Sequence, residues 1–225
     1  MSAASTSRFD AVIFDMDGVL VDSEAFICQA AIAMFAELGV QAQESDFLPF
    51  VGMGENRYLG GVAEKYAAPF SLERDKARTY AIYLDLIVGQ LDALPGVHDF
   101  IGELKAHGFK TAVASSADLV KVAANLREIG LPFDSFEAVV NGMDVEHKKP
   151  APDIFLLAAE RIQVDPQRSL VVEDAISGVT AAKAAGAQCL GLTTSFPAGD
   201  MHEADWIAPD LSAVPAALRG LLFGP

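Results

Sequence analysis

The feature that most constrains the fold is a regular alternation, from about residue 97 onward, of short apolar runs with segments of helical periodicity. The apolar runs predict strands at residues 110–114, 138–141, 169–173 and 188–192, with a short one near 206–207. The segments between and around them predict helices at 97–107, from after 114 to about 129, at 152–162, at 177–185 and at 214–222. Such alternation is typical of a parallel sheet covered by helices on both faces. Right-handed crossovers make this a doubly wound, Rossmann-like α/β sheet.

A further apolar run, residues 11–14, precedes two acidic residues, Asp15 and Asp17, and then Gly18. In an extended chain the side chains of Asp15 and Asp17 point the same way and that of Met16 points the other way. Two converging carboxylates repel each other, so both stay ionised only beside a cation. Gly18 allows the backbone to turn sharply and to approach a ligand closely. The sequence therefore predicts reactive chemistry at this strand end, the alternative being a solvated Asp-Gly turn.

The segment that follows this first strand predicts helices only, at residues 24–38, 44–50, 55–66 and 72–88. We expect it to form an α-helical cap domain, residues 23–90, inserted into a core domain of residues 1–22 and 91–225. Pro95 and Gly96 supply the turn that returns the chain to the core. An insertion at this point lies over the carboxyl ends of the strands, where folds of this class bind ligands.

Polar residues also follow the other predicted strands. Ser115 and Ser116 follow the strand that ends at residue 114, at the expected start of a helix, where backbone amides and the helix dipole favour an anion. An ordinary helix cap is the alternative interpretation of these two serines. Glu173 and Asp174 end the strand at 169–173 and form a good site for Mg²⁺, which takes carboxylate oxygens. The sequence thus predicts an anion site and a metal site at one edge of the sheet.

A lysine pair, Lys148 and Lys149, lies between these strands in the segment KKPAPD. Pro150 and Pro152 fix the backbone there, so one lysine enters the site in a set direction. We expect that lysine to be Lys149. For Lys148 the simpler expectation is a solvated side chain.

The order of these motifs, D-x-D-G, then Ser after a strand, then Lys-Pro, then Glu-Asp, resembles that of the haloacid dehalogenase superfamily. The segments DMDGVLVDSE, KPAPDIF and VVEDAISGV are similar to its phosphoglycolate phosphatase and β-phosphoglucomutase branch. The helical block resembles the α-helical cap of that branch. The resemblance covers most of the chain.

The resemblance implies a magnesium-dependent phosphatase. Asp15 is then the nucleophile that forms an aspartyl-phosphate, and Asp17 is the general acid–base. Ser115 and Lys149 bind phosphoryl oxygens, together with the backbone around Met16, Asp17, Gly18 and Ser116. Mg²⁺ is held by Asp15, the backbone carbonyl of Asp17, and Asp174, with Glu173 contributing directly or through water. A cation, a lysine and aimed amides suffice for phosphoryl transfer, which needs mainly positioning and charge neutralisation.

The implied substrate is a small phosphorylated metabolite of the sugar phosphate, polyol phosphate or phosphoglycolate type. A β-phosphoglucomutase is the main alternative, but Ile27 stands where those mutases have a histidine, and Ala117-Asp118-Leu119 replaces a basic and an amide residue. Haloacid dehalogenases need no metal and lack the second aspartate, so Asp17 weighs against that chemistry. A non-catalytic binding module is the remaining alternative, and the intact acids at every motif argue against it.

Substrate choice is expected to lie in the cap. Arg57 and Lys76 are the candidates for contacting the part of the substrate remote from its phosphate, and Lys76 resembles a cap lysine of this branch. For Arg57, a solvated charge on a helix is an equally good interpretation. The glycines of the cap predict close backbone approach or a mobile loop; these are Gly52, Gly54, Gly60 and Gly61.

The composition excludes some classes of partner. A formal net charge of −15 argues against binding to nucleic acid or to an anionic membrane surface, since both need cationic protein surface. Cys28 and Cys189 are far apart in the sequence and are expected to be buried thiols in a reducing compartment. The N-terminal residues are too few for a signal peptide, which favours the cytoplasm. We expect a monomer or a weak homodimer.

Overall fold

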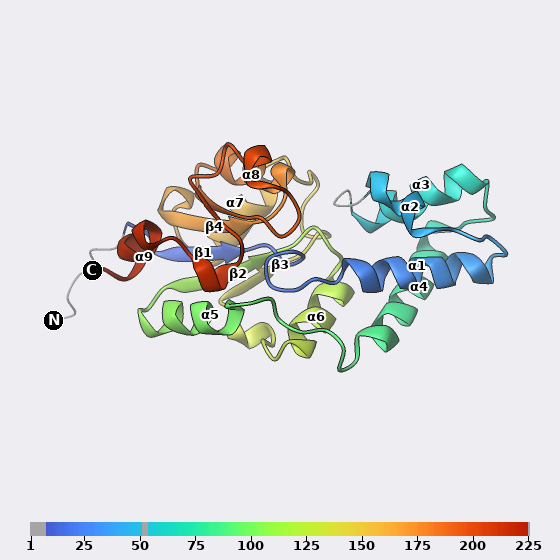
Figure 1. Cartoon of the computed structure of the whole chain (residues 1–225), viewed down its shortest axis with the longest axis horizontal. Coiled ribbons are helices and arrows are strands. Elements are labelled where there is room, and N and C mark those ends of the chain that lie inside the picture. Colours follow the sequence, from blue (N-terminus) through green and yellow to red (C-terminus); the bar gives the residue numbers. More distant parts are fainter. Residues whose placement is uncertain (1–7, 51–53, 225) are drawn as a thin grey trace.

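The computed structural model describes residues 8–50 and 54–224, and in this part of the chain the strands form one parallel sheet (Figure 1). The order across the sheet is β3-β2-β1-β4-β5-β6. The strands are β1 (Ala11–Phe14), β2 (Lys110–Ala114), β3 (Ala138–Val140), β4 (Ser169–Glu173), β5 (Gln188–Leu192) and β6 (Trp206–Ala208). Each neighbouring pair is parallel. The predicted doubly wound, Rossmann-like α/β fold is confirmed.

Side chains of the central strand β1 alternate between two apolar clusters, one on each face of the sheet. Val12 and Phe14 belong to the cluster that includes residues of α5 (Val97–Ala106), α6 (Leu119–Glu128) and α9 (Ala216–Phe223). Ala11 and Ile13 belong to the cluster formed with α7 (Asp153–Arg161) and α8 (Ile176–Ala184). Figure 1 shows α7 and α8 on the side of the sheet opposite to α5 and α6. Burial on both faces explains why these strands are continuously apolar.

The register of the sheet determines which residues meet at its carboxyl edge. Phe14 of β1 pairs with Val113 of β2 and with Val172 of β4. The residues that follow these three positions leave the sheet side by side. They include Asp15 after β1, Ser115 after β2, and Glu173 with Asp174 at the end of β4.

The block between β1 and α5 is helical and lies at one end of the sheet (Figure 1). Its helices are α1 (Glu24–Glu37), α2 (Glu44–Phe47), α3 (Glu55–Tyr66) and α4 (Leu72–Ile87). It has its own apolar cluster, in which the ring of Phe47 lies 6.1 Å from that of Phe35 and 4.9 Å from that of Tyr58. Helices α1 and α4 pack together and also contribute to the main cluster of the sheet. We retain the domain boundaries at 22/23 and 90/91 as a proposal.

The segments that enter and leave this helical block lie next to each other. The backbone N–H of Leu94 donates to the carbonyl of Leu20 at 3.0 Å, and Val21 forms an antiparallel bridge with Ala93. The turn predicted at Pro95 and Gly96 is present, and Gly96 has a positive φ of 82°. A Cβ at Gly96 would overlap the backbone of Ser212, so no other residue fits there.

The structure corrects two expectations about local structure. The α6 helix begins at Leu119, with Asp118 in the N-cap position, so Ser115 and Ser116 lie in the preceding loop and not at a helix start. The helix expected over 44–50 is α-helical only to Phe47 and continues as a 3₁₀ turn over Leu48–Phe50, because its proline lacks an N–H for the α-helical ladder.

Of the two interpretations of the cap glycines, close approach and a mobile loop, the structure supports the first at Gly61, inside the helix predicted over 55–66. Gly60 and Gly61 lie inside α3 and not in a mobile loop, and a Cβ at Gly61 would overlap the ring of Phe50. Close packing therefore explains Gly61. Gly54 precedes α3 with a φ of 80°, which glycine adopts without strain, while Gly52 lies outside the described residues. Among the helices of residues 8–50 and 54–224, none combines the length and apolar character needed to cross a bilayer.

Candidate active site

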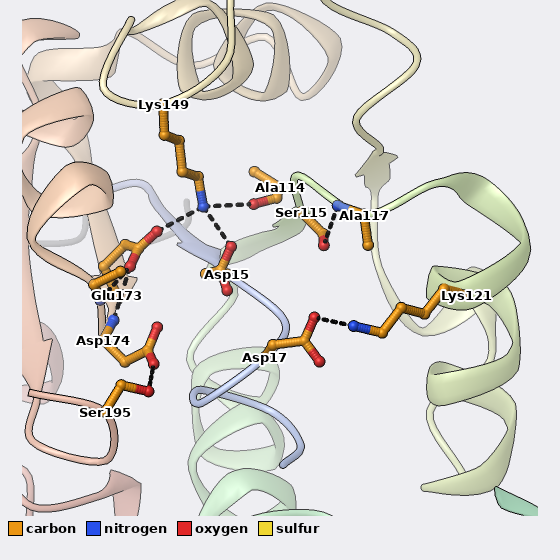
Figure 2. Close-up of polar contacts among 11 residues, drawn as sticks. Asp15, Asp17, Ala114, Ser115, Ala117, Lys121, Lys149, Glu173, Asp174 and Ser195 are labelled. Carbon is orange, nitrogen blue, oxygen red and sulfur yellow. Dashed lines mark hydrogen bonds and ion pairs between the residues drawn. The ribbon is translucent and has the colours of Figure 1, made fainter. Parts of the chain in front are cut away.

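A buried lysine, Lys149, joins the acidic residues of two strands. Its Nζ forms an ion pair with the carboxylate of Asp15 and donates at 2.6 Å to Oε1 of Glu173, and it lies 3.4 Å from the carbonyl of Ala114 (Figure 2). Only 6% of the Lys149 side chain is exposed. Burial alone would lower the pKa of Lys149, but the charges of Asp15 and Glu173 raise it above its ordinary value. The lysine therefore stays charged, in the position that the sequence predicts.

At the carboxyl edge of the sheet, the ionised forms of Asp15 and Asp174 are destabilised. Burial raises the pKa of Asp15 to about 7, although the nearby Lys149 opposes the shift. Burial also raises the pKa of Asp174 to about 8, with further contributions from the charges of Glu173 and Asp15. The hydroxyl of Ser195 donates to the Asp174 carboxylate. Negative charge thus exceeds positive charge around Asp15 and Asp174.

Both oxygens of Glu173 have partners within the protein. Oε1 accepts from Lys149, and Oε2 accepts from the backbone N–H groups of Asp174 and Ala175, each at 2.8 Å. A Cβ at Gly178 would overlap the Glu173 carboxylate, so the glycine makes room for it. These contacts hold Glu173 against Lys149.

Asp17, the second aspartate of the D-x-D-G motif, is hydrogen-bonded by Ser23 and Lys121 and not by Lys149. The hydroxyl of Ser23 donates to one oxygen of Asp17, and Nζ of Lys121 donates to the other at 2.8 Å. Lys121 lies on α6 and its side chain is only 4% exposed, whereas that of Asp17 is 32% exposed. Burial alone would lower the pKa of Lys121, but Asp17 and Glu55 raise it, so the lysine stays charged.

Sequence reasoning did not identify Lys121. The available signal was its place one turn before Asn125 on the face of α6 that packs against the protein, where a lysine needs a partner. Asn125 is itself fully buried and accepts from the hydroxyl of Tyr83. The inner face of α6 is therefore more polar than an ordinary packing face.

Ser115 and Ser116 lie at the carboxyl edge of the sheet, after β2. Ser115 is buried, and its Oγ accepts from the N–H of Ala117 at 3.1 Å. Figure 2 shows the side chains of Ser115, Asp15 and Lys149 facing the same space. A Cβ at Gly142 would overlap the carbonyl of Ser116, so the loop after β3 passes close to this segment.

The backbone of the D-x-D-G motif forms a tight turn. The side chain of Met16 is buried in the main apolar cluster, opposite to the two aspartates, as alternation predicts. Gly18 has a φ of 77°, its N–H donates to the carbonyl of Val21 at 2.7 Å, and a Cβ there would overlap Asp174. The Gly18 amide is therefore already engaged. The amides of Met16, Asp17 and Ser116 donate no hydrogen bond within the described part of the chain.

The two cap cations have protein partners. Lys76 on α4 donates to Asp118 at 2.6 Å and to Asn56 at 2.9 Å, which places it at the boundary between cap and core. Arg57 pairs with Glu64 at 2.9 Å along α3 and is half-exposed, which is the solvated arrangement that we considered for it. The structure thus brings Lys76, and not Arg57, to the cap–core boundary.

Among the described residues, no group of three or more His, Cys, Asp or Glu side chains is placed so that it could hold a metal ion. Asp15 and Asp174 nevertheless fit a hard dication, because their raised pKa values reflect buried negative charge that such an ion would relieve. Gly18 leaves room for the Asp174 carboxylate directly beside the turn that follows Asp17.

Comparison with known proteins gives relatives along almost the whole chain. A model of haloacid dehalogenase-like hydrolases matches residues 9–186. Protein SUPPRESSOR OF QUENCHING 1, chloroplastic, from Arabidopsis thaliana is 42% identical over 200 residues, which are 88% of this chain. The chain spans only 19% of the length of that relative.

Two further relatives match over most of their own length. The phosphorylated carbohydrates phosphatase of Thermotoga maritima is 34% identical over 177 residues, covering 79% of this chain and 82% of that protein. The crystal structure of CbbY from Rhodobacter sphaeroides in complex with phosphate has a TM-score of 0.81 at 28% identity, covering 91% of this chain and 95% of that one.

Proposed function

The chain belongs to the haloacid dehalogenase-like hydrolases, and from this premise we propose that it hydrolyses monophosphate esters of small phosphorylated carbohydrates through an aspartyl-phosphate on Asp15. The observation that carries the proposal is the contact of buried Lys149 with both Asp15 and Glu173. A lysine in this position supplies positive charge to a phosphoryl group and to the nucleophile at once. The phosphate bound by the similar CbbY structure supports an anion site of this kind.

In the first step an oxygen of Asp15 attacks phosphorus and the bond from phosphorus to the ester oxygen breaks. Asp17 gives its proton to that leaving oxygen, and an alcohol departs. In the second step Asp17 takes a proton from water, which attacks the same phosphorus and releases inorganic phosphate from Asp15. Ser115, Lys149 and the amides of Asp17 and Ser116 bind the phosphoryl oxygens throughout.

We further propose that Mg²⁺ is held by Asp15, Asp174 and the backbone carbonyl of Asp17. The ion supplies positive charge that lets an anionic carboxylate approach an anionic phosphate. Glu173 has both oxygens engaged by Lys149 and backbone amides, so we assign it the role of orienting that lysine. Ser195 orients Asp174 through its hydrogen bond.

Water is the acceptor that this site favours. Ile27, at the position where mutases carry a histidine, is buried in the main apolar cluster and offers no proton-transfer group. Without that group the phosphoryl group is not returned to a sugar. Asp17 provides the acid–base function that distinguishes phosphate ester hydrolysis from dehalogenation.

The test is hydrolysis of p-nitrophenyl phosphate and of a panel of carbohydrate monophosphates, with and without a chelator of divalent ions. We expect phosphate release that the chelator stops, no activity in Asp15→Asn, and unchanged activity in Asp92→Asn, which alters an exposed acid elsewhere. Substantial turnover by Asp15→Asn would refute the nucleophile assignment. Efficient isomerisation of β-glucose 1-phosphate with a bisphosphate primer would refute the choice of water as acceptor.

A further inference from the structure

We propose that the site selects esters whose leaving alcohol carries hydroxyl groups and no negative charge, and that Glu55 of the cap enforces this selection. The inference rests on the phosphatase function proposed above and narrows its substrate class. It concerns the side of the site where the alcohol lies, opposite to the phosphoryl group.

The position of the alcohol follows from Asp17. An oxygen that receives a proton from Asp17 must lie within hydrogen-bond reach of its carboxylate. Lys121 touches this carboxylate at 2.8 Å, and its Nζ also lies 3.9 Å from Oε1 of Glu55, at the start of α3 in the cap. The Glu55 side chain is only 10% exposed. An alcohol bound at Asp17 therefore lies at the boundary that Lys121 and Glu55 span.

Negative charge predominates at this boundary. Lys121 faces the carboxylates of Asp17 and Glu55, and Glu24 on α1 interacts electrostatically with Lys121 and Asp17. Oε1 of Glu24 is buried without a hydrogen-bond partner in the described part of the chain. The charge of Lys121 is therefore balanced within the protein, and a second anion would meet carboxylates of like charge.

Apart from Lys121 of the core, a negatively charged group on the alcohol would need a cation from the cap, and the described cap residues offer none that is unpaired. The five basic residues of the cap are each ion-paired, in the pairs Arg57–Glu64, Lys65–Asp46, Arg74–Asp75, Lys76–Asp118 and Arg78–Glu37. The cap residues outside the described part, at 51–53, are uncharged by sequence. The exposed Lys148 belongs to the core and lies beside Gly142, next to the serine loop that we assign to the phosphoryl group. A carboxylate or a second phosphate on the alcohol thus has no unpaired cap cation to bind.

Hydroxyl groups suit the same boundary. The Glu55 carboxylate accepts hydrogen bonds, and the Lys121 ammonium donates them. A polyol or sugar can use both groups, because each hydroxyl is donor and acceptor. Specificity of this kind rests on attraction to one class of ligand and repulsion of another.

The experiment compares kcat/KM for neutral-alcohol esters, sorbitol 6-phosphate and glucose 6-phosphate, with those for phosphoglycolate and fructose 1,6-bisphosphate, at fixed magnesium and ionic strength. We expect the neutral-alcohol esters to be preferred by about tenfold or more, the scale of one unscreened charge contact. Glu55→Lys should lower this preference by a similar factor. Glu73→Lys makes the same charge change on an exposed face of α4 and should leave the preference unchanged.

The outcomes separate the two proposals. Activity towards p-nitrophenyl phosphate together with a preference for phosphoglycolate or the bisphosphate overturns the substrate inference and leaves the phosphatase assignment standing. Equal effects of Glu55→Lys and Glu73→Lys overturn the role of Glu55. No hydrolysis of any ester overturns both. If circular dichroism shows that Glu55→Lys does not fold, the isosteric Glu55→Gln replaces it. We then expect a smaller loss of the preference for neutral-alcohol esters. An unchanged preference in Glu55→Gln would contradict the role of Glu55 in selection.

Discussion

Lys121 donates a 2.8 Å hydrogen bond to the carboxylate of Asp17, a residue 104 positions earlier in the chain. The lysine is almost completely buried, with the ring of Tyr83 6.0 Å from its Nζ. A buried ammonium is stable only beside an opposite charge, so Asp17 and Lys121 stabilise each other's position. The acid–base group of the proposed reaction is thereby oriented by a residue that lies outside every motif.

Replacing Lys121 by methionine should lower kcat by roughly tenfold to a hundredfold, part of what a positioned acid–base group contributes. The KM should change little if Lys121 acts through Asp17, and Lys121→Arg should recover much of kcat because it retains the charge. Steady-state kinetics on p-nitrophenyl phosphate measure both. An unchanged kcat in Lys121→Met, or no recovery in Lys121→Arg, would contradict a positioning role.

Replacing Lys149 by methionine leaves Asp15 and Glu173 buried without their shared cation. We expect a loss of about 3–5 kcal/mol in the free energy of unfolding without magnesium, the usual effect of breaking a buried ion pair, along with loss of phosphate release. Urea denaturation followed by fluorescence measures the stability. The matched control is Lys148→Met, which removes an exposed neighbouring lysine and should be nearly neutral. Equal stabilities for the two variants would show that the Lys149 contacts contribute little.

Gly178→Ala places a methyl group into the Glu173 carboxylate. The carboxylate must shift, so we expect a loss of about 1–3 kcal/mol from overpacking, together with reduced activity because Lys149 loses its support. Gly102→Ala is the control, since a Cβ at that position in α5 meets no atom within 4 Å. It should stabilise the helix by about 0.5–1 kcal/mol. Thermal unfolding of both variants distinguishes the effects, and similar shifts would count against the close contact at Glu173.

Asp46 gives the cap a dependence on pH. Its hydrogen bonds from Lys65, Tyr66 and the amide of Gln43 lower its pKa to about 2. A carboxyl with a lowered folded-state pKa stabilises the fold above its unfolded pKa near 3.8, and this stabilisation is lost as the pH falls towards 2. The stability difference between the wild type and Asp46→Asn should therefore be constant near pH 6 and shrink below pH ~4. A difference that does not change between pH 6 and 2.5 would contradict the assignment.

The sheet and the edge where its polar residues meet were predictable because both follow from local periodicity. The runs that form β1, β2 and β4 are apolar on both faces, and only a parallel sheet covered by helices buries them. Residues that end such strands then meet regardless of their separation in sequence. This is why Lys149 and Asp15, 134 residues apart, were both expected at one site.

The contacts between cap and core were not predictable, because no local pattern specifies how two packed units face each other. Lys76 was expected to lie near the substrate, but nothing in the sequence indicated its partner Asp118, 42 residues away. The helix through Gly60 and Gly61 was predicted from its periodicity, but the reason for its two glycines was not. Glycine disfavours helices intrinsically, and here the packing of Phe50 against Gly61 outweighs that preference.

The pairing of Leu20 with Leu94 and of Val21 with Ala93 brings the two ends of the helical block together at one backbone junction. All six strands of the described chain lie outside the segment between these two points. A block of another length or sequence can therefore be transplanted at this junction while the strands keep their neighbours. On the functions proposed above, such a chimera would acquire the alcohol preference of the donor and keep the phosphoryl chemistry of the host.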